Sequence, residues 1–124
     1  MKPYVLLKAG GKDYRLRINL SSAVELEDKL NCSVVDGLNR LGEVRILAKY
    51  FYAAANSLND DIKEERDALD VIDEFTMQGG KIEDLLEIMG EVMECSGYIK
   101  QEAVDASKKF KAQLMEKQAE LLSK

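Results

Sequence analysis

The sequence predicts a mainly α-helical domain that opens with a β-hairpin and closes with a long C-terminal helix. Residues 13–18, which follow a Gly-Gly pair, alternate apolar and charged side chains, and later segments carry apolar residues at helical spacing. The single proline among the 124 residues is Pro3, so long helices can run with little interruption. This length fits one domain, residues 1–124, made of a hairpin (1–20), a helical core (21–97) and a C-terminal helix (98–124).

The hairpin is predicted from residues 4–8 and 13–18. In the second segment charged and apolar side chains alternate, which is typical of a strand with one buried face. Gly10 and Gly11 lie between the segments and supply the positive φ angles that tight hairpin turns require. A hairpin is strongly favoured over a phosphate-binding loop, because no Lys-Ser or Lys-Thr pair follows the glycines.

Two short helices are predicted next. Ser22 and Glu25 have the spacing of a capping box, which predicts a helix that runs to about Leu30. Asn31 is expected to end it. Ser33 is expected to cap a second helix, with Asp36 three residues on, and Gly42 ends or bends that helix. The apolar residues of the second helix are Val34, Val35, Leu38 and Leu41.

Longer helices are predicted over residues 43–58, 62–77 and 82–94, with a last helix over 98–122. The Gly79-Gly80 pair is expected to stop the second of these four helices. The helix over 43–58 has an expected core stripe of Val44, Leu47, Phe51, Ala54 and Leu58. The helix over 82–94 has the clearest apolar face, made of Ile82, Leu85, Leu86, Met89, Val92 and Met93.

Charge is unevenly distributed along the chain. Residues 1–20 hold five Lys and Arg against Asp13 alone, whereas residues 60–94 hold thirteen acids against three bases. The last 27 residues are basic again, with six lysines against four acids. Such polarity can orient a partner or support head-to-tail self-association. It argues against nucleic-acid binding over the central region, where phosphates would be repelled.

Few residues suit catalysis or metal binding. The chain has no histidine, and Cys32 and Cys95 are isolated, as expected of free thiols in a reducing cytosol. We therefore expect no catalytic residue, no cofactor, no metal site and no enzymatic activity. One acidic cluster fits either a solvated helix face, which we favour, or a metal pair; it comprises Asp67, Asp70, Asp73 and Glu74.

No membrane or export signal is expected. A membrane span needs roughly 18 to 20 apolar residues, and no stretch of the chain approaches that length. The N-terminal apolar run is the four residues from Tyr4 to Leu7, which is shorter than a signal peptide requires.

Partner binding is the function that the apolar pattern favours. The last helix has a sparse apolar stripe and many lysines, which fits either a helix that binds a partner or one that docks loosely on its own domain. Other candidates flank Gly97 or belong to the aromatic run of residues 50–52, although these side chains could equally be core. The candidate partner-binding residues are Tyr50, Phe51, Tyr52, Met93, Tyr98, Ile99, Phe110 and Leu114.

The order of motifs resembles that of the tail assembly chaperones of long-tailed phages and prophages of Gram-positive bacteria. The resemblance covers about residues 10–100, and none of its motifs is catalytic. It rests on residues 11–17, Ala23-Val24-Glu25-Leu26-Glu27 with Leu30, Ile46-Leu47-Ala48, Asp73-Glu74-Phe75, Gly79-Gly80, Leu85-Leu86 and Glu94-Cys95-Ser96-Gly97-Tyr98.

The resemblance implies a non-enzymatic protein that binds the tape measure protein, keeps it soluble and helps recruit tail tube subunits. It implies a location in the host bacterial cytoplasm and absence from the mature virion. Self-association into a homo-oligomer is compatible with the charge polarity. Two alternatives remain open: a structural head–tail or tail component of a phage, and an acidic regulatory adaptor that binds a basic protein.

Overall fold

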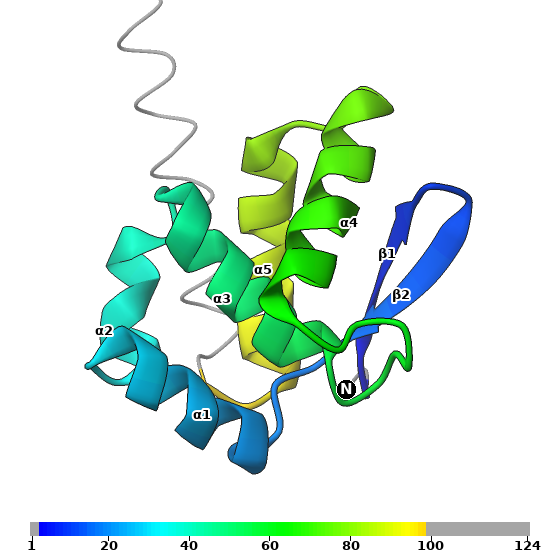
Figure 1. Ribbon diagram of the computed structural model, residues 1–124. Helices are drawn as coiled ribbons and strands as arrows, with labels where there is room; N and C mark the ends of the chain where they lie inside the picture. The colour runs from blue at the N-terminus through cyan, green and yellow to red at the C-terminus, as the bar shows by residue number, and fades with distance from the viewer. Residues whose placement is uncertain (1–2, 99–124) are drawn as a thin grey trace, which may run out of the picture.

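A computed structural model describes residues 3–98 of the chain. This part is mostly helical and has a two-stranded antiparallel hairpin at its N-terminal end, which confirms that part of the predicted fold class (Figure 1). The predicted C-terminal helix lies outside the described residues from residue 99 onward. The elements are β1 (Val5–Ala9), β2 (Lys12–Leu16), α1 (Leu20–Leu30), α2 (Val34–Gly37), the 3-10 helix η1 (Leu38–Arg40), α3 (Val44–Ala55), α4 (Glu65–Met77) and α5 (Ile82–Cys95).

The predicted hairpin and its turn are confirmed. Ala9 of β1 pairs with Lys12 of β2, so Gly10 and Gly11 form a two-residue turn. Their φ angles are +58° and +76°, a conformation that side-chain-bearing residues rarely adopt. Strand β2 ends two residues earlier than predicted, because the chain turns away from β1 after Leu16.

Helix α1 begins earlier than the sequence predicted, and the prediction of Ser22 as its cap is wrong. Asn19 is the N-cap residue, and its side-chain oxygen accepts a hydrogen bond from the main-chain N–H of Ser22 at 2.8 Å. Ser22 therefore already lies in the first turn and is buried. The predicted end is confirmed: Asn31 has a φ of +60° and stops the helix.

Helix α2 begins as predicted but is short. The hydroxyl of Ser33 accepts a hydrogen bond from the main-chain N–H of Asp36 at 3.0 Å, so the predicted cap is confirmed. After one turn the chain continues into η1. Of its apolar residues, Val34 is buried, whereas Val35 is exposed.

Helix α3 is the central helix of the described fold. It packs against α1, α4, α5 and β2, and most of its residues are buried. The predicted core stripe is wrong at its two ends, because Val44 and Leu58 are exposed while the flanking helices cover the middle from several sides. The buried residues of α3 are Ile46, Leu47, Ala48, Tyr50, Phe51, Ala53, Ala54 and Ala55.

Helices α4 and α5 end in the same way. After α4, the N–H of Gly80 donates to the carbonyl of Phe75 at 3.0 Å, with Gly79 at a φ of +96° between them. After α5, the N–H of Tyr98 donates to the carbonyl of Met93 at 2.9 Å. These bonds define Schellman motifs, which satisfy the last carbonyl groups of a helix. The predicted stop at Gly79-Gly80 is thus confirmed.

The start of α4 differs from its predicted position at residue 62. Glu64 caps the helix, and the carboxylate of Asp67 accepts hydrogen bonds from the N–H groups of Lys63 and Glu64, both at 2.9 Å. Ile62 precedes the helix and is buried.

One hydrophobic core joins the hairpin to the helices, so residues 3–20 do not form a separate unit. Leu7, Tyr14 and Leu16 of the hairpin belong to the same cluster as Leu47 of α3 and Val92 of α5. Figure 1 shows the hairpin at one side of the helices, with its tip beside α4. Within residues 3–98, no helix is both long and apolar enough to cross a membrane.

Asn59, in the loop between α3 and α4, holds the free edge of β2. Its side-chain oxygen accepts a hydrogen bond from the main-chain N–H of Arg15 at 3.1 Å, and its side-chain NH₂ donates to the Arg15 carbonyl at 2.7 Å. The same NH₂ group donates to the carbonyl of Ala55 at 2.8 Å. One side chain therefore pairs with the strand edge as another strand would and ties it to α3.

We predict that Asn59→Ala lowers the free energy of unfolding by about 1–2 kcal/mol, because it removes these hydrogen bonds at a partly buried site. Urea denaturation measures the difference. Asp60→Ala is the matched control, because Asp60 is exposed and adjacent. Equal stabilities of the two variants would contradict this role of Asn59.

Candidate functional site

Three of the candidate partner-binding residues are part of the core. Tyr50, Phe51 and Met93 are at most 1% exposed, which places them in the core, the alternative that the sequence left open for them. The hydroxyl of Tyr50 donates a hydrogen bond to the carbonyl of Val34 at 2.7 Å, which joins α3 to α2. Burial raises the pKa of Tyr50 to about 12. These residues hold the helices together.

The other described candidates are half-buried. The hydroxyl of Tyr52 donates to the carbonyl of Lys63 at 3.1 Å, and the ammonium of Lys29 lies 4.5 Å from the centre of its ring. Tyr98 packs against the core, and its buried hydroxyl has no hydrogen-bond partner within residues 3–98. The remaining candidates lie outside the described residues; they are Ile99, Phe110 and Leu114.

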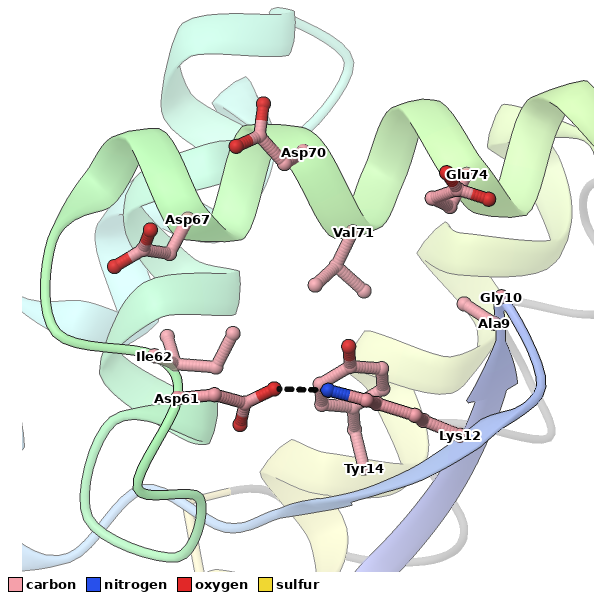
Figure 2. A pocket seen from close by; sticks show the side chains of 10 residues that line it. All are labelled: Ala9, Gly10, Lys12, Tyr14, Asp61, Ile62, Asp67, Asp70, Val71 and Glu74. Atoms are coloured by element: carbon pink, nitrogen blue, oxygen red, sulfur yellow. Dashed lines mark hydrogen bonds and ion pairs between the residues drawn. The ribbon is translucent and has the colours of Figure 1, made fainter.

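The structure instead forms a cavity of about 300 Å³ between the tip of the hairpin and α4, which we call the acidic cavity (Figure 2). Its walls come from three segments that are distant in the sequence: the hairpin, the loop before α4, and one face of α4. The lining residues are Ala9, Gly10, Lys12, Tyr14, Asp61, Ile62, Asp67, Asp70, Val71 and Glu74.

Two of the four carboxylates of the acidic cavity are engaged by neighbouring groups. The ammonium of Lys12 lies 3.4 Å from a carboxylate oxygen of Asp61, so an ion pair bridges the hairpin and the loop (Figure 2). Both groups of this pair are largely exposed, so it contributes little stability. Asp67 caps α4. Asp70 and Glu74 make no hydrogen bond or ion pair within residues 3–98, so the cavity has negative charge to offer a ligand.

Tyr14 provides a phenol group to the same cavity. The residue is 8% exposed, and Figure 2 shows its hydroxyl directed toward the space below Val71. Burial is the main cause of the raised pKa of Tyr14, and the negative charge of Asp61 adds to it. The phenol is therefore neutral at physiological pH and able to donate a hydrogen bond.

The acidic cavity is suited to hold a cationic group. Among the described residues, no three His, Cys, Asp or Glu side chains lie close enough to hold a metal ion. A Lys or Arg side chain has the charge that Asp70 and Glu74 require, and the apolar wall can accept its methylene stem.

Cys95 offers no reactive thiol. Both cysteines are free, and Cys95 is buried. Burial raises the pKa of its thiol, which keeps it protonated and unreactive.

Sequence reasoning found only part of the acidic cavity. The spacing of Asp67, Asp70 and Glu74 placed them on one helix face, as observed. Asp73 does not line the cavity. The sequence predicts Lys12 and Tyr14 only as hairpin residues and Asp61 only as part of a loop, because no local pattern shows that segments about fifty residues apart come together.

Comparisons with protein-family models, curated proteins and solved structures found no match for this chain.

A second surface feature is apolar. Leu20 and Val24 lie one turn apart on α1 and are 81% and 60% exposed, and we call them the α1 apolar pair. Residues at this spacing share a helix face. Met77, at the end of α4, is as exposed as Leu20, at 81%. The α1 apolar pair is costly to leave in water and suits contact with another apolar surface.

The hydrogen bonds of Asp67 predict a pH dependence of stability. Hydrogen bonds from the N–H groups of Lys63 and Glu64 lower the pKa of Asp67 in the folded protein. Its carboxylate therefore stabilises the fold above its unfolded pKa of about 3.9, and this contribution is lost as pH falls through the lower folded value. We predict that Asp67→Asn makes stability fall less steeply in acid than it does in the unsubstituted protein.

Urea denaturation between neutral pH and pH 2 measures this effect. Asp70→Asn is the matched control, because it removes the same charge from the same helix without removing a hydrogen bond. Parallel stability curves for the two variants would show that the cap of α4 is not the cause.

Proposed function

We propose that this protein is a tail assembly chaperone that binds the tape measure protein of a long-tailed phage or prophage and takes no part in catalysis. It keeps that long client soluble in the host cytoplasm, helps to recruit tail tube subunits, and is absent from the finished particle.

The observation that carries the proposal is the structural position of the residues on which the resemblance to the family rests. The Gly10-Gly11 turn precedes the motif of residues 11–17, and both Gly79-Gly80 and Ser96-Gly97-Tyr98 form Schellman ends of helices. The hydroxyl of Ser96 accepts a hydrogen bond from the N–H of Ile18 at 3.0 Å, which ties the last motif to the end of the hairpin. The separate motifs on which the resemblance rests thus form turns and helix ends of one fold, and the last of them is hydrogen-bonded to the end of the hairpin.

The surface supports a binding role. The α1 apolar pair offers an apolar contact at the spacing with which one helix meets another, and the client of such a chaperone is long and helical. The residues that the sequence suggested for this role, Tyr50 and Phe51, are committed to the core, so the α1 apolar pair replaces them as the proposed contact.

We predict that the double substitution Leu20→Ser and Val24→Ser weakens binding to the tape measure protein by about tenfold or more, because it removes two apolar contacts from the interface. Co-expression with a candidate tape measure protein, followed by measurement of its soluble fraction, tests both the proposal and the contact. Met77→Ser is the matched control, because Met77 is as exposed as Leu20 but lies on α4.

Two results would contradict different parts of the proposal. If the client is equally insoluble with and without this protein, the chaperone function is wrong. If the double variant and the Met77→Ser variant keep the client equally soluble, the α1 contact is wrong. Detection of the protein in purified virions by mass spectrometry would favour a structural tail component instead.

The acidic cavity favours a second candidate, an adaptor that binds a basic partner through Asp70 and Glu74. In that case Asp70→Asn with Glu74→Gln would abolish partner binding, whereas the substitutions in the α1 apolar pair would leave it unchanged. The same binding assay, performed with both double variants, separates the two functions.

A further inference from the structure

The two edges of the hairpin differ in their hydrogen bonding. Asn59 binds both main-chain groups of Arg15, so these groups point away from β1. Arg15 is paired with Leu6 in the antiparallel register. Because the main-chain groups of Arg15 point outward, Arg15 and Leu6 form a non-hydrogen-bonded pair of the antiparallel ladder. Both residues of such a pair direct their N–H and C=O groups to the outer edges, so those of Leu6 point away from β2. The direction of the main-chain N–H and C=O groups alternates along a strand, so those of Lys8, two residues after Leu6, also point away from β2.

This outer edge, formed by the main chain of Leu6 and Lys8, is here called the β1 edge. Within residues 3–98, no hydrogen bond reaches these groups from outside the hairpin. An unpaired strand edge offers N–H and C=O groups at the spacing that another extended chain requires. Asn59 already occupies the edge of β2 at Arg15, whereas the β1 edge has no such partner within the described residues.

A groove lies beside the start of β1. It has a volume of about 390 Å³ and includes the exposed carboxylate side chain of Glu91 from α5. Leu6 is 51% exposed at its border, which provides an apolar contact for a neighbouring strand. The lining residues are Pro3, Tyr4, Val5, Leu6 and Glu91.

The negative charge of Glu91 indicates which kind of segment binds beside β1. A strand added to β1 would direct alternate side chains toward α5, where Glu91 favours a basic residue. A second copy of this chain fits poorly, because two β1 strands paired antiparallel place both helical layers on the same side of the joined sheet. The two α5 helices, each with Glu91 at this border, would then approach each other, and their like charges would repel.

We propose that the β1 edge accepts an extended segment of a basic partner protein as a third strand, with a Lys or Arg of that segment against Glu91. Main-chain hydrogen bonds to Leu6 and Lys8 supply affinity, and the groove supplies selectivity for a basic side chain. The inference does not depend on the identity of the client in the proposed function, because it rests on a different surface from the α1 apolar pair.

Amide hydrogen exchange on the full chain tests whether the edge is open. We expect the amides of Leu6 and Lys8 to exchange rapidly, while that of Arg15, held by Asn59, is protected. Protection of Leu6 and Lys8 in the free protein would overturn the proposal. In that case the exchange measurement is repeated after dilution. Protection by a second copy would decrease with protein concentration, whereas protection by the chain's own residues 99–124 would not.

Peptide binding tests the occupant. The probe is the peptide acetyl-Thr-Val-Thr-Lys-Thr-Val-Thr-amide, and NMR titration of the full chain reports its binding. We expect shifts of the Leu6 and Lys8 amide signals, and no shifts with the same peptide methylated at every main-chain nitrogen. Absence of shifts with the first peptide, or equal shifts with both, would overturn the proposal.

A charge exchange tests the role of Glu91, which is exposed, so its substitution leaves the fold intact. We expect Glu91→Lys to bind the lysine peptide about two- to fivefold more weakly, and to prefer the peptide in which glutamate replaces lysine. Glu83→Lys is the matched control, because Glu83 is exposed on the same helix but does not line the groove. Equal effects of the two substitutions would show that Glu91 does not select the side chain.

Discussion

The hydrogen bonds between Asn59 and the main chain of Arg15 hold the hairpin in place, and much of the described fold depends on that docking. An isolated two-stranded hairpin is marginally stable in water. Here the N–H of Arg17 also donates to the carbonyl of Ala54 at 2.9 Å, and that of Ile18 to Ser96. Strand β2 and the two residues after it are thus fixed to α3, to the loop after α3 and to the end of α5, while β1 is held by its pairing with β2 and by its buried face.

The acidic cavity follows from the same docking. Once β2 is fixed against the loop before α4, the hairpin tip must lie beside the acidic face of that helix (Figure 2). Lys12 offsets the charge of Asp61, and Asp67 is used by its own helix cap. Asp70 and Glu74 are left facing the space between the elements. Their charge is therefore a property of the tertiary arrangement, although each residue alone resembles an ordinary solvated acid.

Local signals in the sequence were sufficient for the turns and helix ends. Gly10-Gly11, Asn31, Ser33 and Gly79 each act through main-chain geometry or hydrogen bonds within a few residues, so their roles can be predicted without the fold. The cap of α1 was missed because Asn19 precedes an exposed leucine, which hides the start of the helical period.

The surroundings of α3 could not be predicted in this way. Tyr50, Phe51 and Tyr52 point in directions about 100° apart, so a helix covered on one side would expose at least one of them. Because α3 is covered from several sides, two are fully buried and the third is half-buried. The role of Asn59 is hidden for a similar reason, since its partner Arg15 is 44 residues away.

Whether a residue lies in the core or on the surface decides whether its substitution changes stability or only binding. Tyr50 and Asn59 carry hydrogen bonds that join elements, so changes there alter stability and would confuse any binding measurement. Leu20, Val24 and Glu91 are exposed and join no elements by hydrogen bonds within residues 3–98. Exposed positions of this kind usually change stability by less than about 0.5 kcal/mol. A loss of binding after substitution at α1 or at the β1 groove therefore reports a lost contact, and the two surfaces can be tested independently in the same folded protein.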